Sequence, residues 1–125
     1  MTRSEIQRLL ARLEPFSMLT GEVLKELAAT LSVRTFAAKE LIFLEQTEGD
    51  MAYAIVEGRV ALLKTSTNGK ELIVELLGPG DPFGVIVLLD KQTYPLTARA
   101  QIPTTVLAFG RSAIQPLFKS HPELY

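Results

Sequence analysis

The chain has 125 residues, a length that suits one domain with a single hydrophobic core. It contains no cysteine, which excludes disulfides, iron–sulfur clusters and zinc sites built on thiolates. Its formal net charge is only −1, so the sequence lacks the basic balance expected of a domain that holds duplex DNA by itself.

The first part of the chain is predicted to form two helices. Apolar residues recur at helical spacing over 3–13, and Pro15 ends this pattern. Thr20 is a suitable N-cap for a second helix over 21–30. A first helix packed on the domain is favoured over an amphipathic membrane anchor, because its few arginines give only weak support for lipid binding.

Apolar runs in the sequence are short. The longest, such as 85–89, are far shorter than a helix that crosses a bilayer. The N-terminus has neither the apolar segment nor the small-residue cleavage site of a signal peptide. We therefore expect a cytoplasmic protein with no membrane contact.

From residue 32 to residue 109 the pattern changes to short aliphatic strands separated by turns. Asn68-Gly69 is a strong signal for a hairpin with a type I′ turn, in which both central residues have positive φ. Between 96 and 102, apolar residues alternate with Thr97, Arg99 and Gln101, which indicates one buried face and one solvated face. The expected strands are 41–44, 51–57, 59–64, 71–77, 96–102 and 104–109.

Many short strands joined by glycine turns predict a fold that is mainly β with flanking helices, a β-roll or jelly-roll-like barrel. We expect one domain over 1–125, with helices at 1–31, the β-roll at 32–110 and a C-terminal helical part at 111–125. Ser112 and Gln115 fit a capping box that opens the C-terminal helix. Pro122 fits the first turn of a further helix.

A turn rich in glycine and proline, at 78–82, leads into Phe83-Gly84 and a short apolar segment. Closely spaced glycines let backbone N–H groups converge on a bound anion or polar ligand. The alternative is a tight connection between strands, and spacing alone favours that alternative.

This turn is one of an ordered series that resembles the sensor domain of the catabolite activator and fumarate–nitrate regulator (Crp/Fnr) family, which is built on the cyclic-nucleotide-binding β-roll. The resemblance covers nearly the whole chain from Phe16. The matching segments are Glu48-Gly49-Asp50, 53–60, 68–71, 77–84 and 97–100. In this family the residues after such a domain form a long dimerisation helix and then a helix-turn-helix that binds DNA. The resemblance thus implies a sensory module of a transcription regulator, DNA binding only through a C-terminal domain, and a homodimer of the full-length protein.

Family members that bind cAMP have a glutamate after the Phe-Gly pair, and an arginine followed by serine or threonine before the next strand. Here Val85 stands at the glutamate position, Tyr94 at the arginine position and Pro95 at the serine position. We therefore expect a retained fold with a degenerate nucleotide site that does not bind cAMP. The candidate pocket residues are Gly80, Phe83, Gly84, Val85, Ile86, Val87, Tyr94, Pro95, Leu96 and Thr97.

The apolar side chains of this segment suit a flat hydrophobic small-molecule effector, or they are simply core. Members of the family with this kind of loop include sensors of nitric oxide and related stress, some of which depend on haem. Haem needs an axial ligand. His121 is the one histidine of the chain and a weak candidate for that role, with Met18 and Met51 as weaker ones.

Two other classes of function remain to be weighed. A small β-barrel enzyme of the cupin type uses several histidines on facing strands, and a Ser-His-Asp triad also needs a central histidine. One histidine near the C-terminus does not supply these sites, so no enzymatic activity is expected. A domain without any ligand, retained for protein contacts, fits the sequence as well as a sensor does.

Overall fold

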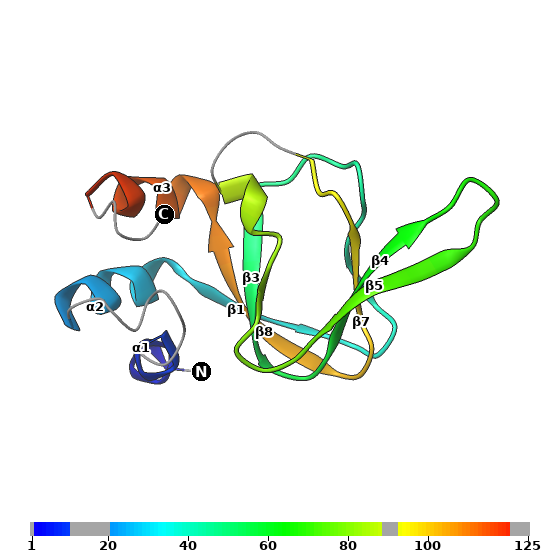
Figure 1. Ribbon diagram of the computed structural model, residues 1–125. Coiled ribbons are helices and arrows are strands. Elements are labelled where there is room, and N and C mark those ends of the chain that lie inside the picture. The colour runs from blue at the N-terminus through cyan, green and yellow to red at the C-terminus, as the bar shows by residue number, and fades with distance from the viewer. Residues whose placement is uncertain (1, 11–20, 89–92, 121–125) are drawn as a thin grey trace.

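The computed structural model describes residues 2–10, 21–88 and 93–120. Helices gather at one end of the molecule, two sheets form its body, and the hairpin of strands β4 and β5 projects from the opposite end (Figure 1). This arrangement of a β-roll with flanking helices confirms the fold expected from the sequence.

Three α-helices flank the sheets: α1 (Arg3–Leu10), α2 (Gly21–Thr30) and α3 (Arg111–Ser120). Helix α1 begins after Thr2, whose hydroxyl accepts a hydrogen bond from the Glu5 N–H (3.2 Å), as an N-cap does. Apolar side chains of all three helices enter one core cluster with strands β3 and β8. Residues 11–13 of the expected first helix lie outside the described residues. None of the helices in the described ranges is long and apolar enough to cross a membrane.

The strands form two antiparallel sheets of four strands each. The first has the order β1-β8-β3-β6 and the second the order β2-β7-β4-β5. The sequence predicted β3 and β5 with these bounds and β2, β4, β7 and β8 with shifted ends, while β1 and β6 were not predicted. The bounds are β1 Ser32–Phe36, β2 Leu41–Phe43, β3 Met51–Glu57, β4 Val60–Thr65, β5 Glu71–Leu77, β6 Pro82–Phe83, β7 Thr97–Ala100 and β8 Thr104–Gly110.

The Asn68-Gly69 hairpin forms as predicted, but the prediction of a type I′ turn is wrong. Gly69 has a φ of +82°, whereas Asn68 is not among the residues with positive φ, so the turn is not of type I′. The Gly69 N–H donates to the Ser66 carbonyl (3.0 Å), and the Ser66 N–H donates to the Lys70 carbonyl (2.8 Å). The connection is therefore longer than two residues, and it needs only one glycine in the left-handed region.

The expected alternation over 96–102 holds only in part. Thr97 is buried although it was placed on the wet face, because its hydroxyl accepts a hydrogen bond from the Glu45 N–H (3.0 Å). Ile102 is exposed although it was placed on the buried face, because strand β7 ends at Ala100 and Ile102 follows in the next turn. Arg99, by contrast, stays partly exposed as a residue of the solvated face and is ion-paired with Glu71.

The start of the C-terminal helix also differs from the prediction. Strand β8 runs through Gly110 directly into α3, so Ser112 lies inside the first turn and not at the N-cap. Gln115, expected to close a capping box, instead donates a hydrogen bond to the Leu88 carbonyl (3.3 Å). Helix α3 is thereby attached to the short 3-10 turn η2 (Val85–Leu88).

Strand β5 exposes apolar side chains along most of its length. It is an edge strand of its sheet, paired with β4 on one side only, and the hairpin that it forms with β4 projects away from the body of the molecule (Figure 1). Only Leu77, at its inner end, is buried. The exposed apolar residues are Leu72, Ile73, Val74 and Leu76.

Candidate functional site

An aromatic cluster fills the space between the two sheets. Its pairs are stacked, tilted or edge-on, with ring centroids between 3.7 and 6.4 Å apart. The four pairs with centroids 5.3–6.4 Å apart have geometries that favour aromatic contacts beyond the burial of their area. The cluster consists of Phe36 from β1, Phe43 from β2, Tyr53 from β3, Phe83 from β6 and Tyr94.

Tyr94 is the cluster member that the sequence comparison above aligned with the arginine of the family pattern. Its ring stacks on Phe43 with centroids 3.7 Å apart and an interplanar angle of 7°, and the residue is only 4% exposed. Its hydroxyl donates to the Met51 carbonyl (2.7 Å). Its backbone is fixed as well, because the Tyr94 N–H donates to the Thr47 carbonyl (3.0 Å) and its carbonyl accepts from the Gln46 N–H (2.7 Å).

Two glycines make room for the Tyr94 ring. A Cβ added to Gly49 would overlap the outer half of this ring, hydroxyl included. A Cβ added to Gly84 would lie 3.3 Å from the same ring and 3.1 Å from Phe43, and Gly84 has a φ of +71° that side chains rarely adopt. Gly49 and Gly84, which carry part of the family resemblance, here enclose a tyrosine of the chain itself.

Beside Tyr94 and Phe43 lies a hollow of about 160 Å³. Five predicted pocket residues, from Gly84 to Ile86 and at 95–96, contribute to its wall. Phe43 and Leu62 also line it and were missed by the sequence reasoning, because they lie on strands far away in the chain. The described residues that line the hollow are Phe43, Leu62, Gly84, Val85, Ile86, Pro95 and Leu96.

The other predicted pocket residues do not line the hollow. Phe83 and Tyr94 belong to the aromatic cluster. Val87 is fully buried, and the Thr97 hydroxyl accepts a hydrogen bond from the Glu45 N–H. Gly80 lies in the turn at 78–82, where its N–H donates to the Ile55 carbonyl (2.8 Å) and is therefore not free for an anion.

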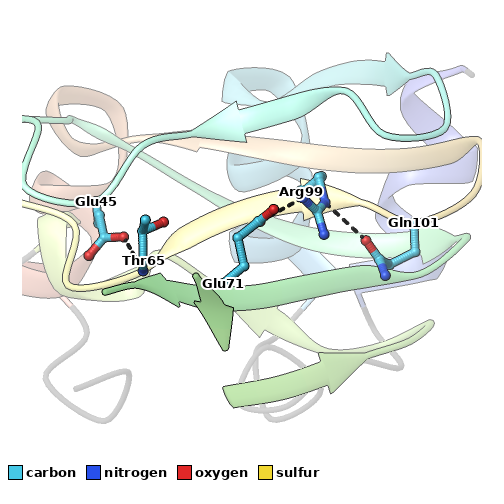
Figure 2. Close-up of polar contacts among 5 residues, drawn as sticks. All are labelled: Glu45, Thr65, Glu71, Arg99 and Gln101. Carbon is cyan, nitrogen blue, oxygen red and sulfur yellow. Dashed lines mark hydrogen bonds and ion pairs between the residues drawn. The ribbon is translucent and has the colours of Figure 1, made fainter. Parts of the chain in front are cut away.

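Nearby cations of the second sheet are engaged with carboxylates. Figure 2 shows Arg99 between Glu71, 2.7 Å from its guanidinium, and Gln101 (3.3 Å). Lys64, two residues along β4 from Leu62, pairs with Glu45 at 3.7 Å, and Glu45 also accepts a hydrogen bond from the Thr65 N–H (2.9 Å; Figure 2). Neither Arg99 nor Lys64 lines the hollow.

Tyr94 is expected to ionise late. Burial raises the pKa of Tyr94 to about 12, and the neighbouring Tyr53, whose pKa burial also raises, adds to the effect. A raised pKa favours the neutral phenol in the folded state, so this contribution to stability is complete below the ordinary tyrosine pKa of about 10. It is lost as the pH rises from there through about 12.

We predict that ultraviolet absorbance of phenolate will record a late titration near pH 12 that disappears in Tyr94→Phe. The Tyr53→Phe variant serves as the control: the Tyr94 titration should remain late because burial is its main cause, although it should move to a somewhat lower pH without the contribution of Tyr53. A Tyr94 titration at the ordinary value would contradict the buried position of its ring.

His121 and Met18 lie outside the described residues, so the structure does not test either of them as a haem ligand. Met51 is described, and its carbonyl accepts the Tyr94 hydroxyl. Over 2–10, 21–88 and 93–120 there is no group of three or more His, Cys, Asp or Glu residues placed to hold a metal ion.

Comparison with known proteins gives a family match for most of the chain. The model of the cyclic nucleotide-binding domain matches residues 33–121. A CRP-like cAMP-activated global transcriptional regulator of Mycobacterium tuberculosis is 24% identical over 119 residues, which are 95% of this chain and 53% of the relative. The cyclic AMP receptor protein of Thermus thermophilus is 33% identical over 89 residues, 71% of this chain and 41% of the relative. The chain thus spans about half the length of these curated relatives or less.

Solved structures of similar domains have the same fold as this chain. The N-terminal domain of a transcriptional regulator from Streptomyces coelicolor A3(2) superposes with a TM-score of 0.81 at 33% identity, covering 93% of this chain and 81% of that one. The sensor domain of the transcriptional regulator DNR from Pseudomonas aeruginosa gives a TM-score of 0.88 at 21% identity, covering 98% of this chain and 82% of that one. The second likeness concerns the fold alone.

Proposed function

Since the chain belongs to the cyclic nucleotide-binding domain family, we propose that it is the ligand-sensing regulatory domain of a Crp/Fnr-type transcription regulator with a nucleotide site that no longer takes cAMP. The single observation that carries the loss of cAMP binding is the buried Tyr94 ring between Gly49 and Gly84. A neutral phenol stands where the family pattern has the cation that binds the cyclic phosphate.

The energetic consequence is large. A phosphodiester prefers an arginine that presents two parallel donors, and a ribose hydroxyl prefers a carboxylate acceptor. Hydrogen bonds to charged groups contribute roughly 1.5–3 kcal/mol each, so replacing both anchors with Tyr94 and Val85 removes about 3–6 kcal/mol. That corresponds to about two to four orders of magnitude in affinity. A dissociation constant of 1 μM would rise to about 0.1–10 mM, before the cost of displacing the Tyr94 ring is counted.

The turn η2 supports a role in signalling, because it joins the hollow to the C-terminal helix. Val85 and Ile86 line the hollow, while Leu88 is buried in the same core cluster as Ile114 of α3. The carbonyl of Leu88 accepts a hydrogen bond from Gln115 of α3 (3.3 Å). A ligand in the hollow presses on the first half of η2, and α3, attached to its second half, moves with it.

The remaining functions belong to the longer protein. A domain that binds DNA has an excess of basic residues, whereas these residues have a formal net charge of −1. This supports DNA binding by a C-terminal domain and not by these residues. Two copies associate as a homodimer through the helix that the resemblance places from near Pro122 onward. No step of this function requires an enzymatic activity.

Isothermal titration calorimetry with cAMP tests the proposal. We expect no saturable heat at micromolar cAMP for the unmodified protein. Val85→Glu combined with Tyr94→Arg should recover part of the affinity, limited by Pro95, which has no N–H to donate. The matched control is Ile86→Glu with Tyr94→Arg, which puts the carboxylate one residue away. A micromolar dissociation constant for the unmodified protein would overturn the proposal.

A further inference from the structure

We propose that the hollow beside Tyr94 binds a small, uncharged ligand built on a single aromatic ring. This inference rests on the proposed function, since it names the class of effector that a sensor with this site takes. The ligand lies against Phe43 and Leu62 on one side and against Val85 and Ile86 of η2 on the other.

The size of the hollow sets the size of the ligand. Its volume is about 160 Å³. An engineered apolar cavity of about 150 Å³ in another protein takes one benzene molecule, whereas sites for drug-sized ligands have about 300 Å³ or more. A nucleotide, with its base, sugar and phosphate, exceeds this space, and so does a haem. One substituted ring fits.

The wall of the hollow sets the charge. Among the residues that the structure describes, 2–10, 21–88 and 93–120, the seven that line the hollow have no ionisable or hydrogen-bonding side chain. The nearest phenol, that of Tyr94, donates to the Met51 carbonyl, and Lys64 beyond Leu62 is paired with Glu45. An anionic ligand would lose its hydration here without gaining a partner, which is costly. The hollow therefore selects against charge.

Two features of the wall indicate that the hollow binds an aromatic ligand and does not stay empty. Val85 and Ile86 are 42% and 45% exposed, so their apolar surface is left in water until something covers it. The Phe43 ring is held in place by its stack on Tyr94, 3.7 Å away. A planar ligand gains from contact with this fixed ring, edge-to-face or offset. Because the Phe43 ring is already held by this stack, little ordering cost opposes contact of a ligand with it.

The test uses fluorobenzene as the probe, followed by ligand-observed ¹⁹F NMR on the 125-residue protein. We expect saturable binding with a dissociation constant of about 1 mM or below, and at least about tenfold weaker binding of benzoate, which has the same ring with a charge. Amide shifts on a labelled sample should fall on Gly84 and Leu96.

Two isoleucines give a matched pair of variants. Ile86 lines the hollow and Ile73 on β5 does not, yet both are 45% exposed, so aspartate is tolerated similarly at each. Ile86→Asp should weaken fluorobenzene binding at least about fivefold, and Ile73→Asp should leave it unchanged. As a second variant, Leu62→Phe fills the hollow and should abolish binding.

The inference is overturned if the unmodified protein does not bind fluorobenzene, if benzoate binds as tightly, or if Ile73→Asp weakens binding as much as Ile86→Asp. A calorimetric titration of the same sample with cAMP separates the two proposals. If neither fluorobenzene nor cAMP binds, only the proposal of an aromatic ligand is refuted. If cAMP binds with a micromolar dissociation constant, the proposed function itself is refuted.

Discussion

Tyr94→Ala is expected to lower the free energy of unfolding by about 3–5 kcal/mol, the range for removing a large aromatic side chain from a core. The ring is 4% exposed and stacked 3.7 Å from Phe43, so its removal leaves a cavity that the surrounding strands cannot close. Urea denaturation followed by circular dichroism measures the change.

Tyr94→Phe is the matched control, since it keeps the ring and removes only the hydroxyl that donates to the Met51 carbonyl. It should cost about 0.5–1.5 kcal/mol, the net value of one hydrogen bond. A loss below about 1 kcal/mol for Tyr94→Ala would indicate a surface side chain, and the account of a filled site would then fail.

Gly49→Ala is expected to lower the free energy of unfolding by about 1–3 kcal/mol, as overpacking of a filled core does. Its new methyl group would overlap the Tyr94 ring, which cannot swing away because Phe43 packs on it and the Tyr94 backbone is bonded to Gln46 and Thr47. Gly78→Ala is the control: nothing lies within 4 Å of its new methyl group, so the change should stay within about 0.5 kcal/mol.

The two substitutions should be strongly coupled. In the Tyr94→Ala background the overlap is gone, so Gly49→Ala should cost almost nothing there, and the double-mutant cycle should give an interaction energy of about 1–3 kcal/mol. Additive effects would mean that Gly49 and the Tyr94 ring are not in contact.

Much of the fold could be predicted because local patterns decide it. The helix at 21–30 and the strands at 51–57 and 71–77 were predicted with the bounds that the structure has. The helix has apolar residues at helical spacing, and the two strands are short runs rich in aliphatic residues that are bounded by turn residues. Strand β6 was missed because its pairing with β3 covers only Pro82 and Phe83, which is too short to leave a period in the sequence.

The site could be predicted only where it is continuous in the chain. The segment at 84–86 and the pair at 95–96 were found from the glycine turn and the family pattern. Phe43 and Leu62 were not, because they reach the hollow through the pairing of β2, β7 and β4, and this register depends on tertiary packing. The exposure of the apolar side chains of β5 could not be predicted either, because a strand rich in aliphatic residues has the same composition whether it lies in the core or projects at an edge.

The most direct test of the central claim, that Tyr94 occupies the site a cyclic nucleotide would need, is an NMR titration of the labelled protein with cAMP that observes the Tyr94 ring. The account predicts strong nuclear Overhauser effects between the ring protons and the α protons of Gly49, unchanged at millimolar cAMP. Loss of these effects together with saturable shifts of the Gly84 amide would contradict it, because the nucleotide would then have displaced the ring.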